Sequence, residues 1–251
     1  MLLQGKVAFL TAAGSGIGRA GAIALAREGA IVTVSDLNGA SARAVADEIV
    51  ANGGQAEAIT LDAADEAAVI AAIDRVASRG RLDILHSQVG IQIPGKLMDV
   101  TCDDMDASWR LNVRAHFIAA RAAMTHMRPQ RAGSIIITAS NSGVQLDRGM
   151  IAYTTTKHAV IAMARQIAAD YACDNVRCNA LCPGFVDTPF NKGFEVQMGG
   201  RAQLEAYVET SIPMRRWATV EEIAASVVFL ASDQSSFMTG HAMVVDGGEC
   251  L

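Results

Sequence analysis

The sequence predicts an α/β domain in which a doubly wound, parallel sheet of about seven strands carries helices on both faces. Short β-branched or apolar segments alternate with amphipathic segments along all 251 residues. This alternation is typical of βαβ units, whose parallel strands are buried between two layers of helices. A glycine-rich stretch, "TAAGSGIG" at 11–18, separates the first such strand from the first helix.

The elements follow one another in a regular order. Strands are predicted at 6–11, 30–36, 56–62, 82–87, 133–140, 175–182 and 241–248. Helices are predicted at 16–29, from the end of the second strand to about residue 52, and at about 103–127, 151–173 and 219–232. No internal repeat, low-complexity tract or Pro/Ser-rich linker divides the chain, so residues 1–251 are expected to form a single domain.

One long segment, 188–213, is expected to be irregular. It is polar, contains glycine and follows the strand predicted at 175–182. Ligands of open α/β sheets bind outside the carboxyl ends of the strands, and loops at that edge commonly close over them. We therefore expect 188–213 to be a substrate lid.

Composition excludes several classes of function. The formal net charge is -5 and no Lys/Arg-rich run occurs, which argues against binding to nucleic acid or to an anionic membrane. No apolar run approaches the roughly 20 residues of a membrane span. The five cysteines include no C-x-x-C pair, and no His or Cys cluster suits a metal. We expect reduced thiols, a cytoplasmic protein and no metal.

The stretch 11–18 resembles a phosphate-binding loop. Unpaired N–H groups and the helix dipole favour an anion at a helix N-terminus, and glycine permits close approach of the backbone. The spacing G-S-G-I-G differs from G-x-G-x-x-G, so the loop alone fits either a cofactor site or a plain helix start. Asp36 favours the cofactor site, because it ends the second strand 18 residues after Gly18 and suits the ribose hydroxyls of a dinucleotide.

Four polar residues have the order of a catalytic group. Tyr153 and Lys157 lie four apart on a predicted helix and therefore share one face. Ser140 ends a strand 13 residues before the tyrosine, and Asn112 lies in the helix before that strand. Each could singly be an ordinary packing, capping or surface residue. Their joint spacing, together with the loop and Asp36, favours catalysis.

With these residues the chain resembles the short-chain dehydrogenase/reductase family over essentially its whole length. The family motif T-G-x-x-x-G-I-G corresponds to Thr11, Gly16, Ile17 and Gly18, and the family's catalytic group to Asn112, Ser140, Tyr153 and Lys157. The later motif N-x-x-x-P-G-x-V-x-T corresponds to Asn179, Pro183, Gly184, Val186 and Thr188, and "MTGHAMVVDGG" to the C-terminal TG…VDGG. The resemblance implies a Rossmann fold and an oxidoreductase.

Two motif positions depart from the family pattern. Ala12 stands where the family has its first glycine, and Ser87-Gln88-Val89-Gly90 stands where it usually has N-N-A-G. The family's asparagines brace the central strands and line the coenzyme site. Both departures leave the four catalytic positions intact.

The resemblance assigns a role to each catalytic residue. A free tyrosine has a pKa of about 10, too high for efficient acid–base catalysis near pH 7. Lys157, one helical turn on, is expected to lower the pKa of Tyr153, which exchanges the proton of the alcohol. Ser140 is expected to hold the reacting oxygen, and Asn112 to position a water that connects Lys157 to solvent.

The resemblance also implies a coenzyme site. Its expected residues are Thr11, Ser15, Gly16, Ile17, Gly18, Asp36, Leu37, Asp62, Ala63, Gly90, Tyr153, Lys157, Pro183, Gly184, Val186 and Thr188. Asp36 followed by Leu37, rather than by an arginine, favours NAD over NADP. The expected activity is an NAD-dependent interconversion of a secondary alcohol and a ketone. A 3-oxoacyl reductase, a hydroxy-acid or polyol dehydrogenase, and a non-catalytic dinucleotide sensor remain as alternatives.

Substrate and assembly are the least defined expectations. By resemblance, the substrate contacts Gln92, Gln145, Leu146, Phe190 and Phe194, an apolar set with two amides. Arginines at 148, 201, 215 and 216 could instead meet a carboxylate. The family commonly forms homotetramers through two long helices, here those at 103–127 and 151–173, and the C-terminal strand region.

Overall fold

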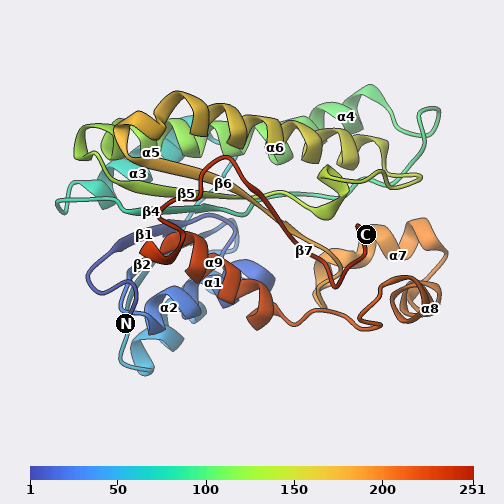
Figure 1. Ribbon diagram of the computed structural model, residues 1–251, viewed down its shortest axis with the longest axis horizontal. Coiled ribbons are helices and arrows are strands. Elements are labelled where there is room, and N and C mark those ends of the chain that lie inside the picture. The colour runs from blue at the N-terminus through green and yellow to red at the C-terminus, as the bar shows by residue number, and fades with distance from the viewer.

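The computed structural model describes all residues 1–251 and contains one seven-stranded sheet (Figure 1). The strand order is β3-β2-β1-β4-β5-β6-β7 and every pairing is parallel. The strands are β1 (Val7–Leu10), β2 (Ile31–Asp36), β3 (Gln55–Thr60), β4 (Ile84–Ser87), β5 (Gly133–Thr138), β6 (Val176–Pro183) and β7 (Ala242–Val245). The doubly wound Rossmann fold predicted from the sequence is confirmed.

Helices cover both faces of this sheet, as Figure 1 shows. The first layer holds α1 (Gly16–Arg27), α2 (Gly39–Ala51) and α9 (Val220–Ala231). The second layer holds α3 (Glu66–Ala77), α4 (Cys102–Trp109), α5 (Ala115–Gln130) and α6 (Ile151–Tyr171). Two further helices, α7 (Lys192–Met198) and α8 (Arg201–Ser211), lie beyond the end of the sheet. None of these helices has the length and apolarity to cross a membrane.

Alternation along the strands divides the core into two halves. Val7 and Phe9 of β1 pack into the cluster under α3, α5 and α6, whereas Ala8 and Leu10 pack into the cluster under α1, α2 and α9. Successive strand side chains point to opposite faces, so a strand buried on both faces must be apolar throughout. All four residues of β1 are buried accordingly.

The order of the strands produces a crevice at one edge of the sheet. From β1 the chain builds outward to β3, then returns to place β4 on the other side of β1 and builds outward to β7. The loops after β1 and β4 therefore diverge at the carboxyl ends of two neighbouring strands. Such a reversal point is where open α/β sheets bind their ligands.

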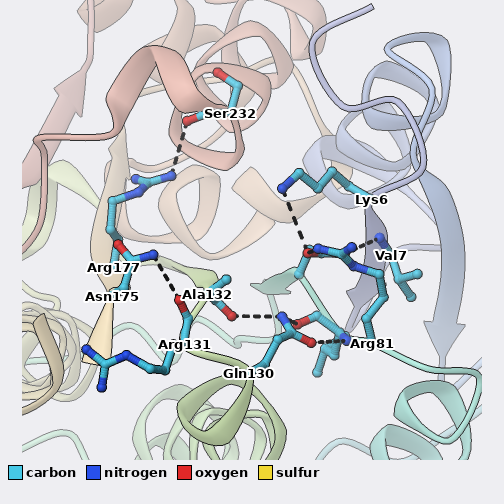
Figure 2. Close-up of polar contacts among 11 residues, drawn as sticks. Lys6, Val7, Arg81, Gln130, Arg131, Ala132, Asn175, Arg177 and Ser232 are labelled. Atoms are coloured by element: carbon cyan, nitrogen blue, oxygen red, sulfur yellow. Dashed lines mark hydrogen bonds and ion pairs between the residues drawn. The ribbon is translucent and has the colours of Figure 1, made fainter. Parts of the chain in front are cut away.

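At the opposite edge of the sheet, where the strands begin, polar side chains connect neighbouring segments by hydrogen bonds and ion pairs (Figure 2). The carboxylate of Asp83, only 4% exposed, accepts hydrogen bonds from the Val7 N–H at 2.9 Å and from Arg81 Nε at 2.6 Å. Gln130 donates to the Leu82 carbonyl at 2.9 Å and accepts from the Leu82 N–H. These buried backbone groups are satisfied, so this edge is fixed independently of any ligand.

The segment 188–213 is helical, contrary to the irregular structure expected for it. Helices α7 and α8 are divided at Gly199, whose positive φ of 90° ends α7. Phe194 and Leu204 from these helices pack with Tyr153 and Phe185 in a third apolar cluster. The hydrophobic positions that form this cluster are few and interrupted by glycine, so the helical period was obscured in the sequence.

Two other helical features concern α3 and the helix expected at 103–127. Helix α3 follows Asp65, whose carboxylate caps it by accepting from the Ala68 N–H. The helix expected at 103–127 is interrupted by a π-helical turn at Arg110–Arg114 and continues to Gln130. A π turn of this kind is a frequent feature of functional sites.

The glycine-rich loop folds tightly against its neighbours. A Cβ on Gly18 would lie 2.4 Å from the Ala12 carbonyl oxygen, and one on Gly14 would lie 2.9 Å from a carboxylate oxygen of Asp36. Ala12 itself has φ of 50°, in the left-handed region that favours glycine. The residue that departs from the family motif therefore occupies a strained conformation.

Replacing Ala12 by glycine is expected to stabilise the ligand-free protein. Relief of the left-handed conformation outweighs the added entropy of the unfolded chain, for a net gain of about 0.5–1 kcal/mol. Urea unfolding would measure the gain, and we expect the Michaelis constant for the coenzyme to change only modestly. Ala13→Gly is the matched control, because buried Ala13 has no positive φ and should lose stability. Equal losses in both variants would contradict strain at Ala12.

Candidate active site

A pocket of about 380 Å³ opens at the carboxyl ends of the strands. Fifteen of the residues expected at the site form part of its wall: Ser15, Gly16, Ile17, Asp36, Gly90, Gln92, Ser140, Tyr153, Lys157, Pro183, Gly184, Val186, Thr188, Phe190 and Phe194. They come from the start of α1 and the loop before it, from the end of β2, from the loops after β4, β5 and β6, and from α6 and α7. The crevice predicted from the strand order and the residues predicted from motifs therefore coincide.

Tyr153 is buried in the first turns of α6, with 3% of its surface exposed. Its ring packs against Phe194 at 5.9 Å and Phe190 at 6.3 Å between centroids. Burial raises the pKa of Tyr153 to about 12, although hydrogen bonding to Ser140 and Gln92 acts in the opposite direction. The lowered pKa expected from the neighbouring lysine is wrong for the ligand-free protein, because desolvation of the phenolate dominates.

Lys157 lies one turn further along α6 and is also 3% exposed. Its ammonium donates to the Thr138 carbonyl at 3.0 Å and lies 5.6 Å from the centroid of the Tyr153 ring. Burial lowers the pKa of Lys157 to about 8, because the charged form loses its hydration. One bond to Thr138 leaves further N–H groups of this ammonium available to a ligand.

Ser140 begins the turn that follows β5. Its hydroxyl accepts from the Ser142 N–H at 3.1 Å, and this bond caps the short 3₁₀ turn at Asn141–Gly143. The capped turn keeps the hydroxyl, which is only 6% exposed, in the pocket wall beside Tyr153. Ser140 and Tyr153 therefore present two hydroxyl groups to the same part of the pocket.

Asn112 lies in the π-helical turn, behind the pocket wall. Its side chain accepts from the Ile91 N–H at 2.7 Å and donates to the Ile91 carbonyl and to Thr156 Oγ1 at 3.0 Å each. A Cβ on Gly90 would lie 3.2 Å from Asn112 Oδ1 and 3.5 Å from Lys157 Nζ. Asn112 thus fixes the loop after β4 directly beside the lysine.

The residues that replace N-N-A-G rebuild the brace between the central strands. The Gln88 N–H donates to Thr11 Oγ1 at 3.0 Å, and the Thr138 hydroxyl donates to Gln88 Oε1 at 2.7 Å. Because that hydroxyl is a donor to Gln88, it accepts from His86 Nε2 at 2.9 Å. The loops after β1, β4 and β5 are therefore connected without the family's asparagines.

Two buried histidines belong to the same brace. Ser87 Oγ lies 2.7 Å from His116 Nδ1 on α5, and both side chains are fully buried. Burial lowers the pKa of His86 to about 4 and that of His116 well below its usual range. Both rings are neutral at pH 7 and act as packing and hydrogen-bonding groups.

The start of α1 fits the pyrophosphate of a dinucleotide. Ser15 precedes the helix but makes no capping bond, so the first N–H groups of α1 have no side-chain partner. Gly16 and Ile17 at this end line the pocket. The Asp36 carboxylate accepts from the Gly14 and Asn38 N–H groups at 2.9 Å each, which holds it at the same end of the pocket. These donors suit an anion, and Asp36 suits ribose hydroxyls.

Comparisons with known proteins agree with this geometry. Residues 11–249 match a family model described as enoyl-(acyl carrier protein) reductase. The 2-keto-3-deoxy-L-fuconate dehydrogenase of Xanthomonas campestris is 40% identical over 98% of this chain and 80% of its own length. Dehydrogenase/reductase SDR family member 6 of Rattus norvegicus is 36% identical over 99% of both chains. The chain belongs to the short-chain dehydrogenase/reductase family.

This short-chain dehydrogenase/reductase is also similar to a solved structure that contains a coenzyme. The gluconate 5-dehydrogenase of Burkholderia cenocepacia, in complex with NADP and tartrate, superposes with a TM-score of 0.92. It is 32% identical and covers 99% of this chain and 96% of its own. Membership of this family makes the protein an oxidoreductase of the class that binds a nicotinamide dinucleotide.

Several expected site residues lie outside the pocket wall. Thr11 and Gly18 lie beneath it as parts of the loop, Leu37 is 71% exposed, Asp62 is exposed and Ala63 is buried. Gln145 and Leu146, which were expected at the substrate end, are not in the wall, and Leu146 is 82% exposed. The turn at Asn141–Gly143 directs Asn141 and Asp147 into the wall instead.

Two carboxylates in the wall were missed by sequence reasoning. Asp147 accepts from the Ser142 hydroxyl, and Glu249 accepts from Asn141 Nδ2 at 2.8 Å and from the Tyr207 hydroxyl at 2.9 Å. Burial raises the pKa of each carboxyl, and the charge of Asp147 raises the pKa of Glu249 further. They lie 102 positions apart in loops without a recognisable motif, so no sequence signal joined them.

Replacing Lys157 by methionine is expected to stabilise the ligand-free short-chain dehydrogenase/reductase at pH 7. Methionine fills the same space without a buried charge. The folded-state pKa of about 8 is below the ordinary 10.5, so the unfolded chain binds the proton more tightly. The resulting cost, up to about 3 kcal/mol, is complete below pH 8 and vanishes as pH rises to 10.5.

Urea unfolding from pH 7 to pH 10 would measure this difference. The advantage of Lys157→Met should shrink steadily as the pH rises. Lys192→Met is the matched control, because Lys192 is exposed on α7 and its removal should change stability little at any pH. A pH-independent advantage for Lys157→Met would show that the ammonium is not destabilised by burial.

Proposed function

We propose that the protein is an NAD-dependent dehydrogenase that interconverts a secondary alcohol and a ketone, with Tyr153 as the acid–base residue. One observation carries this proposal: the Tyr153 and Ser140 hydroxyls and the Lys157 ammonium line one pocket with the free end of α1. A proton donor, an oxygen-binding group, a cation and an anion site are the parts that such a reaction needs. The names of the dehydrogenases to which the chain is similar support the same reaction class.

Each side chain has a defined task at the reacting oxygen. Tyr153 donates its proton to the ketone oxygen during reduction and takes the hydroxyl proton during oxidation. Ser140 holds that oxygen by a hydrogen bond. With its pKa raised to about 12, Tyr153 is protonated at neutral pH, which is the form required for donation. A bound nicotinamide supplies or accepts the hydride.

Lys157 and Asn112 assist this proton transfer without binding the reacting oxygen themselves. The Lys157 ammonium, held by the Thr138 carbonyl, stabilises negative charge on the Tyr153 oxygen whenever the proton is transferred. Its remaining N–H groups are available to the ribose of the coenzyme. Asn112 holds the loop after β4 against Lys157 through its two bonds to Ile91. We assign Asn112 a positioning role rather than contact with the substrate.

The choice of NAD over NADP rests on Asp36. Its carboxylate lies at the end of the pocket next to the glycine-rich loop, where the adenosine ribose of a dinucleotide bound at α1 would lie. A 2′-phosphate there would meet a negative charge, and the following residue, Leu37, offers no cation. The other residues that we propose to contact the coenzyme are the members of the expected coenzyme site that line the pocket wall.

The proposal includes a cytoplasmic homotetramer. All five cysteines are free thiols. Trp109 and Phe117, from α4 and α5, are about half exposed at 45% and 51%, and Leu251 at the C-terminus is fully exposed. Apolar side chains on these surfaces suit contacts between copies of the chain.

Tyr153→Phe is expected to separate chemistry from coenzyme binding. The change removes the proton donor but keeps the ring that packs on Phe194, so hydride transfer should slow by about 10²–10⁴-fold. Stopped-flow measurement of hydride transfer, beside an NADH titration, would test it. NADH affinity should change little. Wild-type rates in this variant would show that Tyr153 is only a packing residue, and NADH bound without any turnover by the wild type would indicate a sensor.

Asp36→Ala is expected to narrow the preference for NAD. In the wild type we expect kcat/KM to favour NAD by at least about tenfold, which corresponds to ~1.4 kcal/mol. Removing the carboxylate removes both the ribose acceptor and the repulsion of a 2′-phosphate. Steady-state kinetics with both coenzymes would measure the ratio, with Asp47→Ala as a control at an exposed carboxylate on α2, outside the pocket wall. Equal values for both coenzymes in the wild type would refute the role of Asp36.

A further inference from the structure

The pocket wall contains more carboxylate side chains than basic side chains. Its ionisable side chains are Asp36, Asp147, Glu249, Tyr153 and Lys157. Asp36 lies at the end of the pocket next to the glycine-rich loop. Asp147 lies at the other end, near Tyr153, and its charge contributes to the raised pKa of that tyrosine. The substrate end of the pocket therefore has two carboxylates, and Lys157 is its one basic side chain.

Neither carboxylate has a basic partner within ion-pair distance. Asp147 and Glu249 are both absent from the ion pairs of the protein. Their hydrogen bonds come from the neutral groups of Ser142, Asn141 and Tyr207. A partly buried carboxylate pair without a counter-ion is unfavourable and is relieved by a cation.

The arginines that could have bound an acidic substrate are engaged elsewhere. Arg201 pairs with Asp187, Glu195 and Glu205 and stacks 4.6 Å from the centroid of the Trp217 ring. Arg216 pairs with Glu222. Neither of them, nor Arg148 or Arg215, lines the pocket. A substrate carboxylate would therefore add a third negative charge to the substrate end of the pocket, where no arginine lies.

An independent observation also indicates a ligand that donates hydrogen bonds. The side chain of Gln92 lines the pocket and hydrogen-bonds Tyr153, while its Oε1 atom, buried beside Gly193, has no hydrogen-bond partner. Buried acceptors normally have partners, and each exception needs an explanation. Asp147 accepts one side-chain hydrogen bond and Glu249 accepts two, so these carboxylates keep unused acceptor sites in the pocket wall. An ammonium group offers three donors and the missing positive charge.

We propose that the substrate is an amino alcohol or amino ketone, whose protonated amine is bound by Asp147 and Glu249 while Tyr153 and Ser140 hold the reacting oxygen. This inference rests on the proposed function and names its substrate class. The carboxylates select the cation by attraction and exclude acids by repulsion, so both elements of specificity come from the same pair. The sugar-acid dehydrogenases to which the chain is similar are named for anionic substrates, which this pocket disfavours.

Kinetics with three matched alcohols would test the substrate class. The probes are 4-amino-2-butanol, 1,3-butanediol and 3-hydroxybutyrate, each with its next longer homologue, assayed by coenzyme reduction. They share a secondary hydroxyl and differ chiefly in the charge at the other end. We expect kcat/KM to be highest for the amine and lowest for the acid, with at least about a tenfold difference between them. A preference for the acid or for the neutral diol would overturn the proposal.

Variants that remove the charge of Asp147 or Glu249 would show whether these carboxylates cause the preference for the amine. In Asp147→Asn and Glu249→Gln, the ratio of kcat/KM for amine over diol should fall at least about tenfold. Glu209→Gln is the matched control, since Glu209 is exposed on α8 and outside the pocket wall, and its ratio should not change. An unchanged ratio in both pocket variants would show that these carboxylates are held for structural reasons only.

A binding measurement separates this inference from the proposed reaction. Calorimetric titration of the Tyr153→Phe protein with NADH present would compare 4-amino-2-butanol with 1,3-butanediol in the absence of turnover. Tighter binding of the amine, lost in Asp147→Asn, supports the substrate class even if no alcohol is oxidised by the wild type. Equal or weaker binding of the amine overturns it, even if neutral alcohols are oxidised and the proposed reaction stands.

Discussion

The hydrogen bonds of Thr138 hold the site together. Its carbonyl accepts from the Lys157 ammonium, while its hydroxyl donates to Gln88 and accepts from His86. Through the further bond from Gln88 to Thr11, one residue at the end of β5 connects α6, β4 and the glycine-rich loop. Because the strands are parallel, these groups all arrive at the same edge of the sheet. The site depends on this junction more than on any single catalytic side chain.

The junction explains how the chain tolerates its departures from the family motif. Ser87 and Gln88 form bonds between strands that the family's asparagines would otherwise form. They do so by recruiting His86 and His116, which burial keeps neutral. A neutral imidazole can donate from one nitrogen and leave the other as a lone pair. The buried nitrogens without partners, His86 Nδ1 and His116 Nε2, are the residual cost of this arrangement.

The parts of the fold that follow from local patterns could be predicted from the sequence. All seven strands were found because each is short, apolar and bounded by turn residues. The positions of Tyr153 and Lys157 followed from helical spacing, which places residues four apart on one face. Helices α7 and α8 were missed, since they are stabilised by packing of Phe194 and Leu204 against residues distant in sequence.

Properties that depend on burial and long-range contacts could not be predicted. The raised pKa of Tyr153 comes from desolvation, which a sequence does not display. Asp147 and Glu249 come from two loops, and nothing in their local patterns connects them. The strain at Ala12 was visible only as a missing glycine, and its cause, a positive φ, required the backbone.

The unfavourable features are confined to one edge of the molecule. The strained Ala12, the buried Lys157 and the carboxylates without counter-ions all lie at the carboxyl ends of the strands, whereas Asp83 and Gln130 satisfy the backbone at the other edge. Groups that would be unstable alone can persist where the surrounding structure fixes them. Here the two apolar layers and the tied amino-terminal edge supply that support. The edge that carries the unpaired charges is therefore the one at which a ligand can supply the missing partners.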